Sequence, residues 1–285
     1  RSFLGGPRVL VVAVIIGVLL RLVAGIVTGP GGTTLNEFGV LSQNMAEGRG
    51  FSYFSVDDRG DVAIDDAHEG RPLPSAFMPP GYTVTVAAAL AVSPSTDAAV
   101  RLLQAFQALL GGAAIALMYC LARQLFGRVA GGLAALGYAL YPVFVYQATQ
   151  TSPSNEYLLL EIGALVLLIE ASRRRGWWWA AAAGLTLGGV ALLRAEALLL
   201  IGLAAAWLGW SRHRCGRSVL VPVAAVLVVG LAFPAGWAIR NTVVLGEPTP
   251  TLTTTGGYNL WLGNAAGASG SQKDRPALTA AMRSE

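Results

Sequence analysis

The stretch VLVVAVIIGVLLRLVAGIVT, residues Val9–Thr28, decides the class of fold. It is 20 residues long and contains one charged side chain, Arg21. A helix needs about 20 mostly apolar residues to cross the hydrocarbon core of a bilayer. The whole chain agrees with this stretch: 54% of its 285 residues are hydrophobic and 13% are charged. Soluble domains carry about 25% charged residues, so the sequence predicts an integral membrane protein.

Six further runs are apolar and long enough to predict membrane-spanning helices. They are Ala98–Ala122, Val129–Gln147, Ser154–Ala171, Trp177–Leu193, Ala195–Trp210 and Ser218–Ile239. Together with Val9–Thr28 they predict an all-α polytopic membrane protein with about seven transmembrane helices. One more run, Tyr82–Val92, is too short to span and is typical of a re-entrant or interfacial segment.

The basic residues predict the orientation of these helices. If Tyr82–Val92 does not cross, three groups of arginines fall on one side together with the amino terminus: Arg123 and Arg128, Arg173–Arg175, and Arg212, Arg214 and Arg217. Cytoplasmic loops collect Lys and Arg, so this side is expected to be inside. If the run does cross, Arg123 and Arg128 lie outside instead. The first arrangement is favoured because it keeps the basic loops together.

This topology divides the chain into two parts. Residues 1–239 form a transmembrane module that includes a long outer loop, residues 29–81, with interfacial helices. Residues 240–285 form an outer polar segment, which we expect further helices to follow. The outer face therefore carries that first loop, the turn Thr149–Glu156 and the polar segment. Most acidic residues fall on this face, and Glu37 lies near the start of its first loop.

Several classes of protein are not indicated. Two cysteines, Cys120 and Cys215, provide neither a disulfide framework nor a metal-binding spacing. The chain has no P-loop, dinucleotide-binding glycine motif or nucleophile elbow, and no nucleic-acid-binding motif. The stretch Asp57–Asp61 predicts a hairpin turn between two short strands. A calcium site is the alternative there, but no regular spacing of oxygen ligands indicates a divalent cation.

Ionisable residues at membrane depth are functional candidates, because burying them in lipid is costly. Arg21 is expected to snorkel towards the interface, and Glu161 to pair with a neighbouring helix. Arg194 has two open interpretations: a bidentate contact with a phosphate, or a contact within the protein, as a pair with Glu196 or a cap on carbonyls. After the last span come Arg240 and Asn241, and then a segment rich in amides, hydroxyls and aromatic rings. Such a segment suits sugar recognition, and it equally suits an ordered polar loop.

Several stretches of the chain follow one known pattern. They include Asn36-Glu37 with Met45–Phe51 behind it, Pro79-Pro-Gly-Tyr82, Arg101–Gln104, Leu121–Gly127, Tyr141-Pro142, Asn155-Glu156, Arg194 after a glycine-rich run, and Trp237-Ala-Ile-Arg-Asn241 followed by Gly256–Asn264. In these stretches the chain resembles the polytopic glycosyltransferases of the GT-C class, specifically the bacterial branch related to dolichyl-phosphate-mannose protein mannosyltransferases and the lipid A aminoarabinose transferase. Arg194 matches the arginine that ends the family's glycine-rich helix.

The resemblance implies a reaction at the outer face of a bacterial cell membrane. A sugar would pass, with inversion, from a polyprenyl-phosphate donor to a hydroxyl of a protein, glycolipid or cell-wall glycan. Glu37 would be the catalytic base, with Arg194 and Arg240 near the donor phosphate. Substrate contacts would come from Asn36, Tyr82, Glu156, Asn241, Tyr258, Asn259, Trp261 and Asn264.

The chain departs from the family at Asn36, where an aspartate is usual and serves as the base. An amide cannot accept a proton, so that role passes to Glu37 or is lost. A catalytically impaired lipid-binding homologue is therefore the first alternative function. A transporter or membrane scaffold is the second, although the chain lacks the matched interrupted segments that transporters show.

Overall fold

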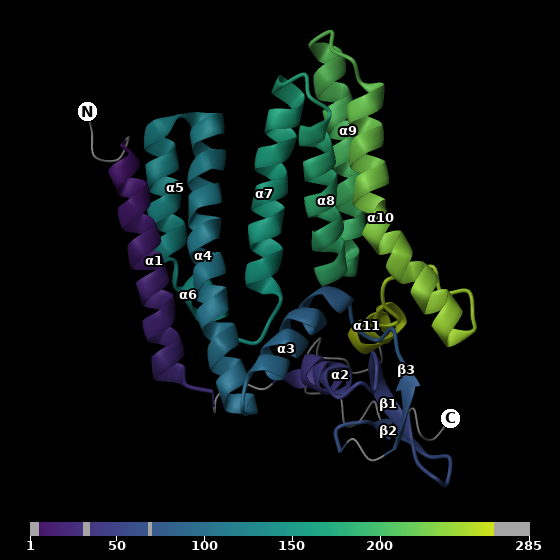
Figure 1. The fold of residues 1–285 in the computed structure, drawn as a ribbon. Coiled ribbons are helices and arrows are strands. Elements are labelled where there is room, and N and C mark those ends of the chain that lie inside the picture. Colours follow the sequence, from purple (N-terminus) through teal and green to yellow (C-terminus); the bar gives the residue numbers. More distant parts are fainter. Residues whose placement is uncertain (1–5, 31–34, 68–69, 265–285) are drawn as a thin grey trace.

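A computed structural model of the chain describes residues 6–30, 35–67 and 70–264. Its main body is a bundle of long helices that run side by side (Figure 1). They are α1 (Pro7–Thr28), α4 (Thr96–Phe126), α5 (Arg128–Leu140), α7 (Ser154–Arg173), α8 (Trp178–Leu193), α9 (Leu198–Arg214) and α10 (Leu220–Leu245). Within the described residues, α1, α4 and α10 are long and apolar enough to cross a membrane, and α3, α5 and α8 are shorter apolar helices. The count of seven crossings remains a prediction.

Smaller elements gather at one end of this bundle (Figure 1). They are α2 (Asn36–Ala46), β1 (Ser52–Val56), β2 (Val62–Ile64), β3 (Arg71–Pro74), α3 (Pro80–Val92) and α11 (Thr255–Asn264). We call this the loop-one end, because most of these elements belong to residues 29–81. Helix α3, which covers the short run Tyr82–Val92, lies obliquely across it and does not run along the bundle.

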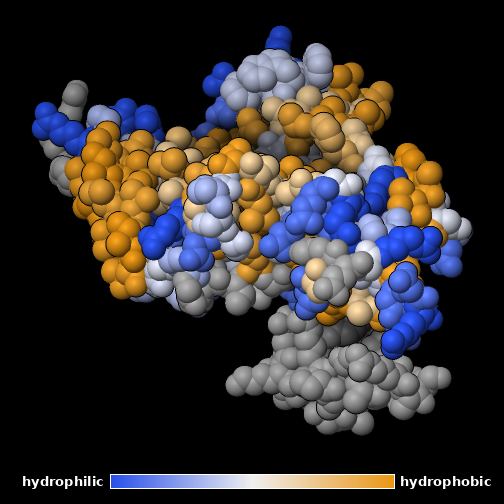
Figure 2. All heavy atoms as spheres, turned by 60° about the horizontal axis from the view of Figure 1, so that its bottom comes forward, coloured by the Kyte–Doolittle hydropathy of each residue, from blue (hydrophilic) through white to orange (hydrophobic). Residues whose placement is uncertain are grey.

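The opposite end holds the amino-terminal start of α1 and the turns α4–α5, α7–α8 and α9–α10 (Figure 1). These turns contain the three groups of arginines named above, so we call it the arginine end. The bundle therefore has the arrangement that the arginines predict. On the side of the bundle that Figure 2 shows, hydrophobic side chains cover the flank, as a surface facing hydrocarbon requires.

The expected span Val129–Gln147 is wrong as a single helix. It breaks at Tyr141 into α5 and the short helix α6 (Pro142–Gln147). Proline has no N–H, so Pro142 cannot donate to the carbonyl of Tyr138 one turn earlier. The break leaves carbonyl groups at the end of α5 that need another donor.

Arg21 of α1 supplies that donor, so the expectation that it snorkels is also wrong. Its Nη2 donates to the Tyr138 carbonyl and its Nη1 to the Ala139 carbonyl, both at 3.3 Å. The side chain is 1% exposed. Space for it comes from Gly111 of α4, where a Cβ would lie 2.5 Å from Arg21 Nε. An arginine inside the bundle thus repairs the break that a proline makes.

The loop-one end contains a small antiparallel sheet, so the all-α prediction is incomplete. The strand order is β2-β1-β3, and the predicted hairpin between β1 and β2 is confirmed. Asp57 Oδ1 closes its turn by accepting the N–H groups of Arg59 and Asp61, each at 2.9 Å. Strand β3 was not predicted because its two prolines cannot donate to a ladder, and such strands occur at sheet edges.

An ion pair joins the turn after α2 to the residue that follows β2. Arg49 Nη2 donates to Asp65 Oδ2 at 2.7 Å, and the Asp65 side chain is 1% exposed. Burial raises the pKa of Asp65. The hydrogen bonds from Arg49, Ser55 and Asn44 and the charge of Arg49 outweigh burial, so the net pKa lies below its usual value. The carboxylate therefore stays charged and holds the sheet.

Helices α8 and α10 approach closely through glycines. A Cβ at Gly184 would lie 2.7 Å from the Val226 carbonyl oxygen, and a Cβ at Gly188 would lie 2.7 Å from the Gly230 carbonyl oxygen. Small residues allow backbones to meet in this way inside membranes. Helix α10 continues to Leu245, beyond the expected end at Ile239, and bends in its second half (Figure 1), consistent with Pro234 inside it.

Candidate functional site

Five helices meet in one hydrophobic cluster at the loop-one end. Phe38 of α2, Tyr82 of α3, Leu103 of α4, Leu193 of α8 and the partly buried Tyr157 of α7 pack together there. The rings of Phe38 and Tyr82 meet edge to face, with centroids 5.0 Å apart. We call this the outer cluster. It brings residues that are more than 150 positions apart in the sequence to one place, and several candidate residues are neighbours of its members.

Glu37 directly precedes Phe38 of the outer cluster. It lies in the first turn of α2 and is half-buried. The N-terminus of a helix carries partial positive charge, which favours a carboxylate there. The side chain of Asn36 lies outside what the structure describes, so its expected substrate contact remains a prediction.

Glu156 and Tyr82 lie together between α7 and α3. Glu156 interacts with Thr85 and acts electrostatically on Tyr82. Glu156 Oε1 and Tyr82 Oη are buried, and neither has a hydrogen-bond partner within the described residues. Burial raises the pKa of the Tyr82 phenol, and the charge of Glu156 raises it further, so the phenol remains a donor. Buried polar atoms are usually paired, so these two atoms mark a place that a polar group from elsewhere can fill.

Arg194 ends α8 one residue after Leu193 of the outer cluster. Its guanidinium lies over the ring of Tyr157, with Cζ 5.2 Å from the centroid. Its Nη1 is 3.4 Å from Glu196 Oε1, and the two side chains are 44% and 65% exposed. Exposed ion pairs contribute little. Both sequence interpretations therefore coexist: Arg194 touches Glu196, yet most of its donors remain available for an anion.

Arg240 and Asn241 have a different setting, on the side of α10 that faces the sheet. Arg240 Nη1 donates to the Ser75 carbonyl at 2.6 Å, and its guanidinium lies over the ring of Trp237, 4.8 Å from the centroid. Asn241 is fully buried, and its Nδ2 donates to the Thr251 carbonyl at 3.0 Å. These contacts tie loop one and the segment after α10 to the bundle.

The remaining candidates lie in α11. Asn259 is exposed, and Asn264 Nδ2 donates to the Leu260 carbonyl of the same helix. Trp261 is 36% exposed and makes a contact of its own. The side chain of Tyr258 lies outside the described residues. None of the recorded contacts joins α11 to the outer cluster, so its sugar-binding role stays a prediction.

A cavity of about 390 Å³ lies between α3, α8 and α10. Its walls are apolar: Pro80, Gly81, Val84, Leu192, Phe233 and Trp237 line it. Gly81 is required for the close approach of α3 to α8, because a Cβ there would lie 2.8 Å from the Leu192 carbonyl oxygen. The cavity is therefore a hydrophobic space, and the guanidinium of Arg240 lies over the ring of its lining residue Trp237.

The described residues contain no group of three or more His, Cys, Asp or Glu side chains that could hold a metal ion. Sequence reasoning also missed two residues of this region, Tyr157 and Thr85. Both lie in apolar helical runs where nothing distinguishes them from packing residues. Their positions next to Arg194 and Glu156 depend on the way the helices meet.

Comparison with known protein families identifies the fold. Residues 78–237 match the model of the dolichyl-phosphate-mannose-protein mannosyltransferase family. The match covers more than half of the chain. The chain belongs to this family. It is therefore a polytopic membrane protein and a glycosyltransferase that takes its sugar from a lipid-phosphate-linked donor. No curated protein matches the chain.

The family match also divides the candidate residues. Tyr82, Glu156 and Arg194 lie inside the matched segment, whereas Glu37 and Arg240 lie outside it. The resemblance seen in the sequence is confirmed over residues 78–237. The roles of individual residues are separate questions.

Proposed function

We propose that the protein transfers a sugar from a polyprenyl-phosphate donor to an acceptor hydroxyl on the outer face of a bacterial cell membrane, with inversion. The observation that supports the proposal is the outer cluster. It contains Tyr82 and the chain neighbours of Glu37, Glu156 and Arg194, and an apolar cavity lined by Gly81 and Leu192 lies next to it. The loop-one end faces outwards because the arginines gather at the other end. The acceptor is a protein, a glycolipid or a cell-wall glycan.

Arg194 is assigned to the donor phosphate. Its guanidinium lies over the ring of Tyr157, and its side chain is 44% exposed. Arginine binds phosphate through two parallel N–H···O bonds, and it neutralises the charge that grows on the departing phosphate. The apolar cavity beside Leu192 suits the first isoprene units of the donor. Arg240 is assigned instead to holding loop one in place, because its donors bond to backbone carbonyls.

Glu37 is assigned as the base. Its carboxylate takes the proton of the acceptor hydroxyl while that oxygen forms a bond to the anomeric carbon. The bond from the anomeric carbon to the donor phosphate oxygen breaks, and its electron pair leaves with the polyprenyl phosphate. Attack from the side opposite the phosphate inverts the sugar. Tyr82 and Glu156 provide a hydrogen-bond donor and an acceptor for substrate hydroxyls.

The phosphate role is tested with Arg194→Ala and Arg194→Lys in membranes supplied with polyprenyl-phosphate mannose and a membrane acceptor extract. Loss of a positioned donor of this kind lowers turnover by about 10²–10³-fold. We expect that fall for Arg194→Ala and partial recovery for Arg194→Lys. Arg59→Ala, at the exposed tip of the β1–β2 hairpin, is the matched control and retains full turnover. Full turnover by Arg194→Ala contradicts the assignment.

One observation favours a second candidate, a lipid-binding homologue without transfer activity. Asn36 provides an amide where the family usually has a carboxylate. The Asn36→Asp variant separates the two candidates. If the natural chain binds polyprenyl phosphate but transfers sugar only after this substitution, the second candidate is correct. If the natural chain transfers sugar and Glu37→Gln abolishes transfer, the first is correct.

A further inference from the structure

An apolar groove runs along the bundle on the side of the arginine end. Its volume is about 390 Å³, and it lies where α4, α7 and α9 face one another. The side chains that decide its character are Leu121, Leu125, Leu165, Ile169, Leu203 and Trp207. On α7 it extends from Glu161 to Ile169, a rise of about 12 Å at 1.5 Å per residue. We call it the α4–α7–α9 groove.

On two of the helices that line this groove, the same helix face includes an arginine further along the chain. On α7, Leu165, Ile169 and Arg173 are spaced by four residues and share one face. On α9, Leu203, Trp207 and Arg214 are spaced by four and seven residues and also share a face. The groove is therefore mostly apolar, with Glu161 as its one charged lining residue, and the same helix faces reach Arg173 and Arg214 beyond Ile169 and Trp207.

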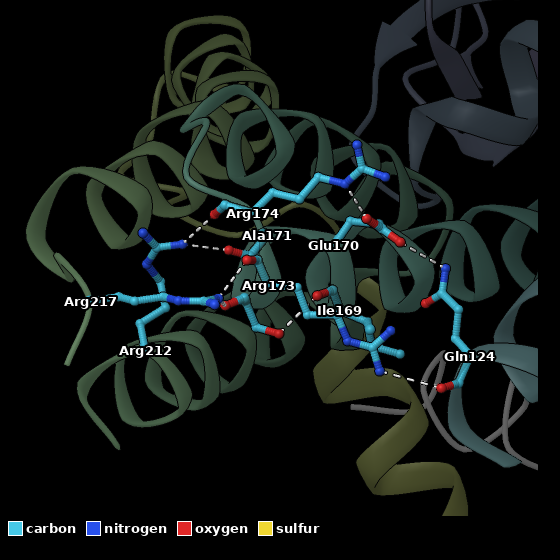
Figure 3. A network of polar contacts seen from close by, with 9 residues as sticks. Gln124, Ile169, Glu170, Ala171, Arg173, Arg174, Arg212 and Arg217 are labelled. Carbon is cyan, nitrogen blue, oxygen red and sulfur yellow. Dashed lines mark hydrogen bonds and ion pairs between the residues drawn. The ribbon is translucent and has the colours of Figure 1, made fainter. Parts of the chain in front are cut away.

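Two neighbouring arginines, Arg212 and Arg217, form hydrogen bonds with backbone carbonyls, as Figure 3 shows. Arg212 Nη1 donates to the carbonyls of Ala171 and Arg174 at 2.6 and 2.9 Å, and Arg217 Nη1 donates to the carbonyls of Ser172 and Arg173. These bonds cap the end of α7 and fix the α7–α8 turn against the α9–α10 turn. The end of the groove is thereby rigid before any ligand binds.

Arg173 and Arg214 form fewer recorded hydrogen bonds than Arg212 and Arg217. One hydrogen bond of Arg173 is recorded within the described residues, from Nη2 to the Gln124 carbonyl at 3.3 Å, although a guanidinium has five N–H donors. Arg214 lies over the ring of Trp210 at 4.4 Å. Both are exposed. Their remaining donors are available to a ligand.

The charge around this site is strongly positive. The described arginine end has nine arginines: Arg8, Arg123, Arg128, Arg173, Arg174, Arg175, Arg212, Arg214 and Arg217. It has one carboxylate, Glu170, whose two oxygens are taken by Arg174 and by Gln124 Nε2. An anion at the end of the groove therefore meets no competing free carboxylate from this part of the chain.

We propose that the α4–α7–α9 groove binds one anionic phospholipid from the leaflet on the arginine side. One acyl chain lies in the groove, and the phosphate lies between Arg173 and Arg214. The site is separate from the outer cluster and does not depend on the proposed transfer reaction. The apolar side chains of the groove contact the acyl chain. The positive charges of Arg173 and Arg214 favour a lipid with a negative headgroup over a zwitterionic one.

Native mass spectrometry of the detergent-purified protein, titrated with dioleoyl phosphatidylglycerol or dioleoyl phosphatidylcholine, tests the proposal. We expect the parent to retain phosphatidylglycerol at concentrations where phosphatidylcholine dissociates. The Arg173→Gln/Arg214→Gln variant should bind phosphatidylglycerol at least tenfold more weakly. The matched control, Arg59→Gln/Arg71→Gln, removes the same charge at the loop-one end and should bind as the parent does. Equal binding by parent and Arg173→Gln/Arg214→Gln overturns the proposal.

The groove is tested separately from the headgroup contact. Leu203→Trp fills it and should weaken phosphatidylglycerol binding several-fold. Because this variant could misfold, brominated acyl chains provide a second measurement on the folded parent. Brominated phosphatidylglycerol should quench part of the tryptophan fluorescence, and Trp207→Phe should remove that part. Quenching that Trp207→Phe leaves unchanged overturns the acyl-chain placement.

Discussion

At the arginine end, Arg212 is 3% exposed and donates to three backbone carbonyls, those of Ala171, Arg174 and Ser218. At the loop-one end, the Arg194 side chain is 44% exposed and lies on an aromatic ring, with one weak contact to a carboxylate. The same residue type thus has two uses. Where the N–H donors of an arginine lie beside backbone carbonyls, they satisfy the carbonyls freed at a helix break or a helix end. Where those donors are exposed, the arginine can bind an anion.

Arg21 and Arg240 sharpen this comparison because the sequence suggested other roles for both. Arg21 lies at membrane depth and Arg240 in a stretch that resembles the family, yet both donate to backbone carbonyls. The number of carbonyls within reach of a guanidinium, and not its depth in the membrane, separates the two groups. Substitutions in each group should therefore have different consequences.

Glu37→Gln should produce the largest effect, on activity alone. A positioned base contributes about 10²–10⁴-fold to rate, so turnover should fall by that factor while the fold is unchanged. Glu47→Gln, at the exposed end of the same helix, is the control and should transfer sugar normally. Transfer from polyprenyl-phosphate mannose measures both. If the two variants are equally active, the base assignment is wrong.

Arg212→Gln should produce the largest loss of stability. It leaves buried carbonyls at the end of α7 without a donor, which costs about 2–3 kcal/mol. The midpoint of thermal unfolding in detergent should fall accordingly. Arg214→Gln, two residues along the chain, should shift the free energy of unfolding by less than about 0.5 kcal/mol. Equal shifts would show that the two arginines do not differ as their contacts indicate.

Arg240→Ala should have a smaller and local effect at the loop-one end. It removes the donor to the Ser75 carbonyl, a charge-assisted hydrogen bond worth about 1.5–3 kcal/mol to the local structure. Hydrogen exchange should speed up around Phe51 and Ser75 and stay unchanged in α5. Uniform exchange across the chain would mean that Arg240 does not hold loop one.

Acidification should have the smallest effect, confined to the sheet. The folded pKa of Asp65 lies below its usual value of about 3.9, so its ion pair with Arg49 stabilises loop one above that pH. The stabilisation is lost as the pH falls below about 4, through the folded pKa. Limited proteolysis of loop one between pH 6 and pH 3 should show cleavage rising at the low end. Arg49→Gln should remove most of this dependence, and an unchanged profile would contradict the pair's role.

The sequence predicts the helical bundle and its arrangement well, because hydrophobic run length and arginine placement act over single segments. It also predicts the Asp57–Asp61 hairpin, whose turn chemistry is local. The sequence does not predict features that depend on contacts between residues far apart in the chain. Nothing near Pro142 indicates that Arg21 would satisfy the freed carbonyls. The two prolines of β3 are untypical of a strand, so the sequence did not indicate that edge strand.

The candidate site shows the same limit. Phe38 and Tyr157 are ordinary aromatic positions in the sequence. Only packing brings Phe38 against Tyr82 and Tyr157 beneath the guanidinium of Arg194. Motif matching placed Arg194 and Arg240 in one group, because a motif carries residue types and spacing but not the neighbouring carbonyls. The structure separates the two by what their guanidinium groups touch.

The affinity for decaprenyl phosphate of Arg194→Ala, measured beside Arg240→Ala, tests the central claim most directly. The claim is that the open arginine of the loop-one end binds the donor phosphate and the closed one holds the fold. We expect the dissociation constant of Arg194→Ala to rise about tenfold or more, as loss of a charge-assisted contact of about 1.5–3 kcal/mol requires, and that of Arg240→Ala to change far less. An unchanged constant for Arg194→Ala, or a larger rise for Arg240→Ala, would contradict it.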